Sequence, residues 1–181
     1  MNMTMNMNLT TKEKFLLEDQ KTHEQACILK YSNYANLASD QQLKNIFKQN
    51  GQAEQEHLNT INQLLSGQIP SMTQQSGGNK QPQQQSQQTS QVQKSQQASQ
   101  MQQMSNSSQQ QNSSNTKWTD KDLCTDILMT EKFVSGAYNT AVFEFRDTQI
   151  RDALNHIQKE EQQHGESVFK YMEDNGMYSA K

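Results

Sequence analysis

The chain lacks the long apolar runs, the basic clusters and the leader that mark several common classes of protein. No stretch of the 181 residues is apolar enough to cross a bilayer. The lysines and arginines are dispersed and the formal net charge is only -3, so we expect no binding to nucleic acid or to a membrane surface. The N-terminus has neither the basic start nor the apolar core of a signal peptide. We therefore expect synthesis in a cytoplasm.

Cysteine and apolar residues are also scarce. The two cysteines, Cys27 and Cys124, both fall on apolar helical faces, where we expect buried free thiols rather than a disulfide. Only 31% of the residues are apolar, against about 45 to 50% in globular domains. The deficit is concentrated between residues 68 and 116, where Gln, Ser and Asn dominate. Such a segment buries too little apolar surface to offset its ordering entropy, and we predict a disordered Gln-rich linker.

The rest of the chain consists of two similar halves. An offset of 107 residues superposes Glu54-Gln-Glu-His57 on Glu161-Gln-Gln-His164. The same offset superposes two further pairs, Glu24 on Glu131 and Tyr31 on Tyr138. Self-similarity at one fixed offset indicates a duplicated structural unit.

Both halves have the pattern of two helices. Apolar residues recur at three- and four-residue steps, which is typical of one face of an α-helix. Capping residues precede these runs at Thr10 and Thr119, and stop signals follow at Gly67 and Gly176. We predict an all-α fold divided into a disordered N-terminus (1–10), a helical hairpin (11–67), the linker (68–116) and a second hairpin (117–178).

The length of the linker suits a crossover along a bundle. A helix of about 25 residues is about 38 Å long. A flexible linker of about 49 residues has a root-mean-square span of roughly 35 to 42 Å. The third helix is therefore able to begin at the end of the bundle opposite the end of the second.

Every one of the four apolar faces contains a glutamate, and two of them carry a histidine one turn later. A carboxylate on an apolar face must be paired, protonated or bound to a cation, because an isolated buried charge is strongly unfavourable. Two divalent ions would balance the four charges, and two neutral imidazoles would add none. A glutamate from each of two helices with Glu-x-x-His from each of the other two is the ligand arrangement of ferritin-like di-metal carboxylate bundles.

We therefore predict a ferritin-like four-helix bundle that holds two divalent transition metal ions. The predicted metal ligands are Glu24, Glu54, His57, Glu131, Glu161 and His164. Carboxylate and imidazole suit both Mn and Fe, so the sequence does not choose between them. The alternative is that the same six residues form a buried hydrogen-bonded network without metal.

Other polar residues near the apolar faces have simpler interpretations. Tyr31 and Tyr138 are either hydrogen-bonding partners of the ligands or core tyrosines. We interpret the remaining histidines and flanking glutamates as surface residues: His23, His156, Glu18, Glu56, Glu144 and Glu160.

Three stretches resemble a known family. They are Thr130-Glu-Lys-Phe-Val-Ser-Gly-Ala-Tyr-Asn-Thr-Ala, Glu160-Glu-Gln-Gln-His-Gly-Glu and Tyr171-Met-Glu-Asp-Asn-Gly-Met-Tyr178. They resemble the coat F domain of the spore coat proteins of endospore-forming bacteria; the likeness covers both hairpins and is strongest from Lys121 to Tyr178. The resemblance implies a ferritin-like bundle that is made in the mother cell and deposited in the spore coat. Its implied partners are other spore coat proteins and the protein itself, and no defined activity is implied.

Two functions compete at this point. In the first, the protein is a structural or assembly component of the coat whose bundle holds metal or the relic of a metal site. Its linker would contact neighbouring coat proteins, and its glutamines with Lys80 and Lys94 would permit glutamine-lysine cross-linking. In the second, the protein is a di-manganese or di-iron redox enzyme of the manganese-catalase or peroxidase type. Glu54 and Glu161 would then bridge the ions, and each ion would have one histidine.

Overall fold

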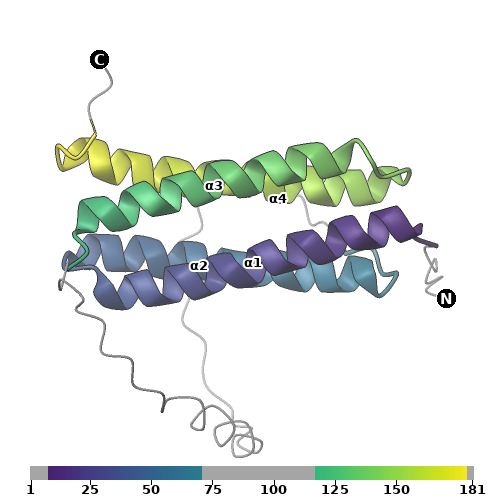
Figure 1. Ribbon diagram of the computed structural model, residues 1–181, viewed down its shortest axis with the longest axis horizontal. Helices are drawn as coiled ribbons and strands as arrows, with labels where there is room; N and C mark the ends of the chain where they lie inside the picture. The colour runs from purple at the N-terminus through teal and green to yellow at the C-terminus, as the bar shows by residue number, and fades with distance from the viewer. Residues whose placement is uncertain (1–7, 71–116, 179–181) are drawn as a thin grey trace, which may run out of the picture. The chain divides into compact units, whose positions relative to one another are not determined.

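A computed structural model describes residues 8–70 and 117–178, which form four α-helices (Figure 1). Two helices precede the predicted linker and two follow it: α1 (Thr11–Leu37), α2 (Gln41–Leu65), α3 (Asp120–Val142) and α4 (Thr148–Asp174). The described residues contain no strand, and the predicted all-α four-helix bundle is confirmed. Residues 1–7 and the predicted linker from residue 71 on, with Lys80 and Lys94, lie outside the described residues.

The helices begin at residues whose side chains accept hydrogen bonds from the first-turn backbone. Thr10 and Thr119 form capping boxes with Glu13 and Asp122, which confirms both predicted helix starts. The other two helices have aspartate caps, Asp40 and Asp147. These side chains satisfy backbone N–H groups that have no partner within the helix.

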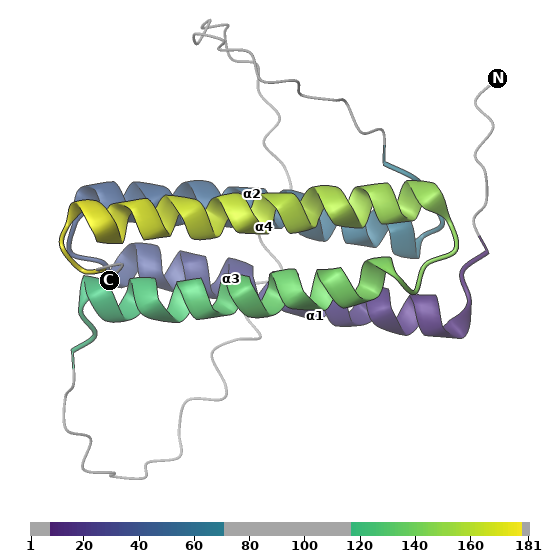
Figure 2. The ribbon, with the colours of Figure 1, turned by 90° about the horizontal axis from the view of Figure 1, so that it is seen from above.

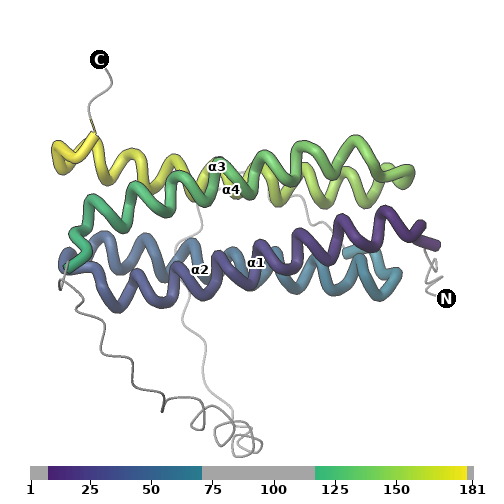
Figure 3. Tube along the Cα trace, in the orientation of Figure 1, coloured from purple at the N-terminus to yellow at the C-terminus, as the bar shows by residue number. Residues whose placement is uncertain are grey.

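The four helices pack as two antiparallel hairpins. α1 pairs with α2 and α3 with α4, while α1 also contacts α3 and α2 contacts α4 (Figure 2). Asp120, at the start of α3, accepts hydrogen bonds from Ser39 and Asp40 in the turn between α1 and α2. α3 therefore begins at the end of the bundle opposite the end of α2, as the trace in Figure 3 shows. This is the arrangement expected for a long crossover connection.

The opposite end of the bundle is held together by a buried carboxylate. Glu13 of α1 accepts a hydrogen bond of 3.0 Å from the backbone N–H of Arg146, in the turn between α3 and α4. The same side chain closes the capping box of Thr10. Leu9 is also buried, so the bundle begins ahead of the predicted boundary at residue 11.

The apolar faces of the helices meet in one core. Its largest fully buried apolar side chains include Phe47, Leu17, Leu43, Ile61, Leu123, Ile127, Leu154 and Ile157. Cys27 and Cys124 are buried free thiols, as predicted. None of the four described helices combines the length and the apolar character needed to cross a membrane.

One glycine marks a close approach between α1 and α2. A Cβ atom built on Gly51 would lie 3.0 Å from Cβ of Tyr31, so the neighbour would have to move. At Gly136, in the middle of α3, a Cβ atom would meet nothing within 4 Å. The two glycines therefore differ in what an added methyl group would do.

We expect Gly51→Ala to lower the free energy of unfolding by about 1 kcal/mol, because overpacking costs about 1–3 kcal/mol and exceeds the gain in helix propensity. Gly136→Ala is the matched control and should raise the free energy of unfolding by roughly 0.5–1 kcal/mol. Urea denaturation followed by circular dichroism measures both. A Gly51→Ala protein as stable as the Gly136→Ala protein would contradict the close approach.

Candidate metal centre

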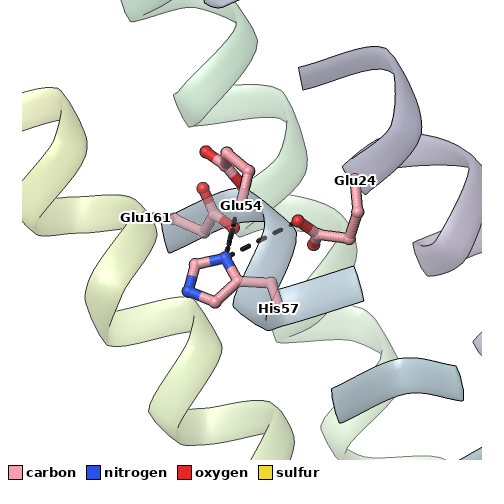
Figure 4. A group of neighbouring side chains, drawn as sticks. All are labelled: Glu24, Glu54, His57 and Glu161. Carbon is pink, nitrogen blue, oxygen red and sulfur yellow. Dashed lines mark hydrogen bonds and ion pairs between the residues drawn. The ribbon is translucent and has the colours of Figure 1, made fainter. Parts of the chain in front are cut away.

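The six predicted ligands come from all four helices and meet inside the bundle. Glu24 lies on α1, Glu54 and His57 on α2, Glu131 on α3, and Glu161 and His164 on α4. Their exposed fractions run from 0% to 6%. Figure 4 shows Glu24, Glu54, His57 and Glu161 pointing toward one another from three helices.

The ligand atoms form two overlapping groups of four. The first group has Glu24, Glu54, His57 and Glu161, and the second has Glu54, Glu131, Glu161 and His164. Within each group the ligand atoms lie within 4.8 Å of one another. Glu54 and Glu161 belong to both groups, and the other four residues belong to one group each. The helices thus place two four-ligand sets side by side.

Both histidines turn the same ring nitrogen to the carboxylates. Nδ1 of His57 lies 3.1 Å from Oε1 of Glu161 and 3.2 Å from Oε2 of Glu54. Nδ1 of His164 lies 3.0 Å from Oε1 of Glu54 and 3.6 Å from Oε2 of Glu161. The two rings are stacked, with centroids 5.5 Å apart. The two Glu-x-x-His motifs therefore face each other across the bundle.

The repeated tyrosines hold the two glutamates that belong to one group each. The hydroxyl of Tyr31 donates a hydrogen bond to Glu131, and that of Tyr138 donates one to Glu24. Each tyrosine thus reaches across from one hairpin to the other. Asn50 donates a further hydrogen bond of 3.2 Å to the hydroxyl of Tyr31. The sequence left open whether these tyrosines contact the ligands or only fill the core. The structure shows that both donate hydrogen bonds to predicted ligands.

Several buried carboxylate oxygens have no hydrogen-bond partner. They are Oε2 of Glu24, Oε2 of Glu131 and both oxygens of Glu161. Burial, with the nearby charge of Glu161, raises the pKa of Glu24 to about 8. Burial and the contact with Glu161 raise the pKa of Glu131 to about 11. In the absence of metal, these two carboxyl groups are therefore protonated at pH 7.

The pKa values of both buried imidazoles are raised, although burial alone lowers the pKa of a histidine. Burial by itself lowers the pKa of His164, but the contacts with Glu161 and Glu54 outweigh it and raise this pKa to about 9. Burial opposes the charge on His57 too, yet Glu160 and Glu161 hold its pKa far above the usual range. Without metal, the environment therefore favours the neutral form of Glu24 and Glu131 and the charged form of both imidazoles.

Glu160 is a contact of the centre that the sequence did not reveal. We interpreted it as a surface residue, but its side chain is only about one third exposed and Oε2 lies 2.9 Å from Nε2 of His57. A carboxylate on the second ring nitrogen orients a metal-binding histidine and fixes which nitrogen is free. At the offset of 107, Glu160 corresponds to Ala53, so the repeat that identified the six ligands carried no signal for it.

The other surface residues lie apart from the centre. Glu18, Glu56 and Glu144 are exposed, as expected. His156 is about half exposed, and its Nε2 atom lies 3.5 Å from Glu160. His23 is half-buried, packs edge-on against Phe133 and belongs to neither ligand group.

Comparison with known proteins identifies one half of the bundle. Residues 119–181, which include α3 and α4, match the family model of the Coat F domain. No curated protein and no solved structure matches the chain. The match contains three of the six clustered residues, Glu131, Glu161 and His164. The C-terminal hairpin of the chain therefore carries the match to the Coat F domain.

Proposed function

We propose that the protein is a spore coat component built around a di-metal carboxylate centre of the ferritin-like type. The match of residues 119–181 to the Coat F domain supports a place in the spore coat. Other coat proteins, and further copies of this chain, would be its partners there. The metal centre would hold the four helices together and so contribute to the assembly or the durability of the coat.

The observation that carries the metal is the set of buried carboxylate oxygens without a hydrogen bond. Buried polar atoms are normally hydrogen-bonded in folded proteins. Here four oxygens of Glu24, Glu131 and Glu161 make no hydrogen bond, although each lies 3.1–3.9 Å from Nδ1 of a histidine, and all belong to residues of the two ligand groups. The donor set of carboxylate and imidazole suits Mn or Fe. These features favour a metal centre over the metal-free network.

The ligands divide naturally between two ions. Glu24 and His57 would serve one ion, Glu131 and His164 the other, and Glu54 and Glu161 would be shared. Tyr138 and Tyr31 would position Glu24 and Glu131 through their hydroxyls, and Glu160 would position His57. The ions would supply cross-links between helices and, in the second candidate function, redox chemistry.

Each ion would join both hairpins. The first ligand group draws on α1, α2 and α4, and the second on α2, α3 and α4. A metal ion that binds the folded state and not the unfolded state raises the free energy of unfolding. The increase is about 2.7 kcal/mol when the free metal concentration is 100 times the dissociation constant. A centre of this kind would therefore resist separation of the hairpins.

We expect the full chain to bind two Mn²⁺ or Fe²⁺ ions and Glu161→Ala to lose both, because Glu161 is shared between the groups. Glu173→Ala, which removes an exposed glutamate from the same helix, should retain two ions. Elemental analysis after gel filtration measures the content of all three proteins. Full metal content in the Glu161→Ala protein would remove the proposed centre.

Metal loading should release close to four protons per chain at pH 7. The protons come from Glu24, Glu131, His57 and His164, whose pKa values all lie above 7 in the metal-free protein. Affinity should consequently rise with pH from 6 to 8. Indicator-dye titration in weak buffer counts the protons, with a pre-chelated metal as the control. Release of one proton or fewer would show that the ions bind elsewhere.

A second candidate function is peroxide disproportionation, or a related redox reaction, at the same two ions. The observation that favours it is a cavity along α3 and α4 whose lining includes Glu131 and Glu161. A centre with a purely structural task has no need of such an opening. The coat role and the redox role are compatible with each other.

The redox candidate predicts that Mn-loaded protein decomposes hydrogen peroxide at least tenfold faster than a His57→Ala/His164→Ala variant exposed to the same metal. Removing both imidazoles takes one ligand from each group, and circular dichroism checks that the variant keeps its helices. Peroxide absorbance at 240 nm follows the reaction, and free Mn²⁺ provides the blank. Equal slow decay in both proteins would end the redox candidate and leave the structural one.

A further inference from the structure

The second hairpin is hollow beside the ligand cluster. A cavity of about 630 Å³ lies along α3 and α4. Exposed side chains form its outer part, among them Lys132, Asn139 and Glu166. Its lining also includes the buried ligands Glu131 and Glu161. The cavity therefore adjoins two members of the second ligand group, which themselves are buried.

Small residues create this space. Ser135, Gly136 and Gly165 all line the cavity. A Cβ atom on Gly165 would stand 3.8 Å from Glu131, in ordinary contact, so a larger side chain there would extend over that glutamate. Three small residues on facing helices thus leave room that longer side chains would fill.

The first hairpin is built differently at the matching positions. The offset of 107 places Ile28, Leu29 and Leu58 where the second hairpin has Ser135, Gly136 and Gly165. The ligands themselves are the same in both halves, since Glu24 and Glu54 match Glu131 and Glu161. The repeat has therefore kept its ligands and has diverged in the residues that surround them.

The chemistry of the lining indicates what would fit. Apolar surface dominates the cavity, with Leu128, Phe169 and Tyr178 among its walls. Ligand sites for small molecules typically have about 300–1,000 Å³ and an apolar lining with a few polar groups. A volume of about 630 Å³ far exceeds that of a peroxide molecule, which is about the size of a water, about 30 Å³. An organic molecule is the better match.

At the inner end of the cavity, a bound molecule would contact the ion through an oxygen atom. If each of the four residues of a ligand group gave one donor atom to an ion, about two of the six or so positions around Mn would remain for an atom from outside the protein. The group that contains Glu131, Glu161 and His164 adjoins the cavity. An anionic oxygen group would be attracted there by the ion and repelled by the glutamates without it.

We propose that this cavity binds a small organic molecule with an apolar body and a carboxylate head, and that the head reaches the metal ion at Glu131 and Glu161. The proposal rests on the di-metal centre proposed above. Binding is metal-dependent, because the head needs the ion. It occurs on the second hairpin, where the small residues leave room for the apolar body.

The experiment uses the full chain loaded with Co²⁺, a coloured and paramagnetic substitute for Mn²⁺ or Fe²⁺. Phenylacetate is the probe, and acetate, which lacks the apolar body, is the size control. Changes in the Co²⁺ absorption bands and broadening of the phenylacetate proton resonances report binding next to the ion. We expect phenylacetate to bind at least tenfold more tightly than acetate, and to leave the metal-free protein unaffected.

Gly165→Leu installs in the cavity the residue that the first hairpin has at the matching position, Leu58. It should weaken phenylacetate binding at least tenfold and leave acetate binding and Co²⁺ content within twofold. Asn59→Leu adds the same side chain at the exposed position that corresponds to Glu166, and should change nothing. Gly136→Leu, at a position with free space around Cβ, replaces Gly165→Leu if circular dichroism shows that the latter does not fold.

The outcomes separate the two proposals. Absence of Co²⁺ binding overturns the metal centre and this inference with it. If Co²⁺ loading is normal but phenylacetate binds no more tightly than acetate, the proposed ligand site is overturned and the metal centre is not. The proposed ligand site is also overturned if the folded Gly165→Leu or Gly136→Leu variant binds phenylacetate as tightly as the wild type. Binding of phenylacetate to the metal-free chain would show that the head does not depend on the ion, and would also overturn the inference.

Discussion

Four glutamate side chains are buried together at the centre of the bundle, and this constraint shapes the rest of the structure. An ionised carboxylate in such a place needs opposite charge close by. The chain provides imidazoles that reach Glu54 and Glu161 within about 3 Å, and tyrosine hydroxyls for Glu24 and Glu131. Protons can neutralise the cluster without metal, and two divalent ions can replace those protons. The fold is therefore compatible with both states.

The bundle and its cluster of buried polar residues were accessible from the sequence because they obey simple periodic rules. Three- and four-residue apolar steps indicated the helices, and the capping residues Thr10 and Thr119 fixed two of their starts. The offset of 107 selected Glu24, Glu54, His57 and their counterparts from a chain rich in polar residues. Buried polar side chains on apolar faces are rare, so a repeated set of them carries much information.

The features that the sequence did not indicate are those in which the halves differ. Glu160 reaches His57 from a neighbouring helix, and its counterpart Ala53 has no side chain that could do so for His164. The cavity arises because Gly165 faces α3 at the right level, which depends on how α3 and α4 pack. Periodicity assigns a residue to a face of its own helix. It does not state which atoms of another helix lie opposite.

The Coat F segment contributes only half of the ligand set. Glu131, Glu161 and His164 lie on α3 and α4, and the remaining three ligands lie on α1 and α2. A lone hairpin of this kind is incomplete and can close a centre only by meeting a second one. Here that second hairpin is encoded in the same polypeptide. Two separate molecules with one such hairpin each would have to dimerise to reach the same composition, whereas one chain supplies both hairpins here.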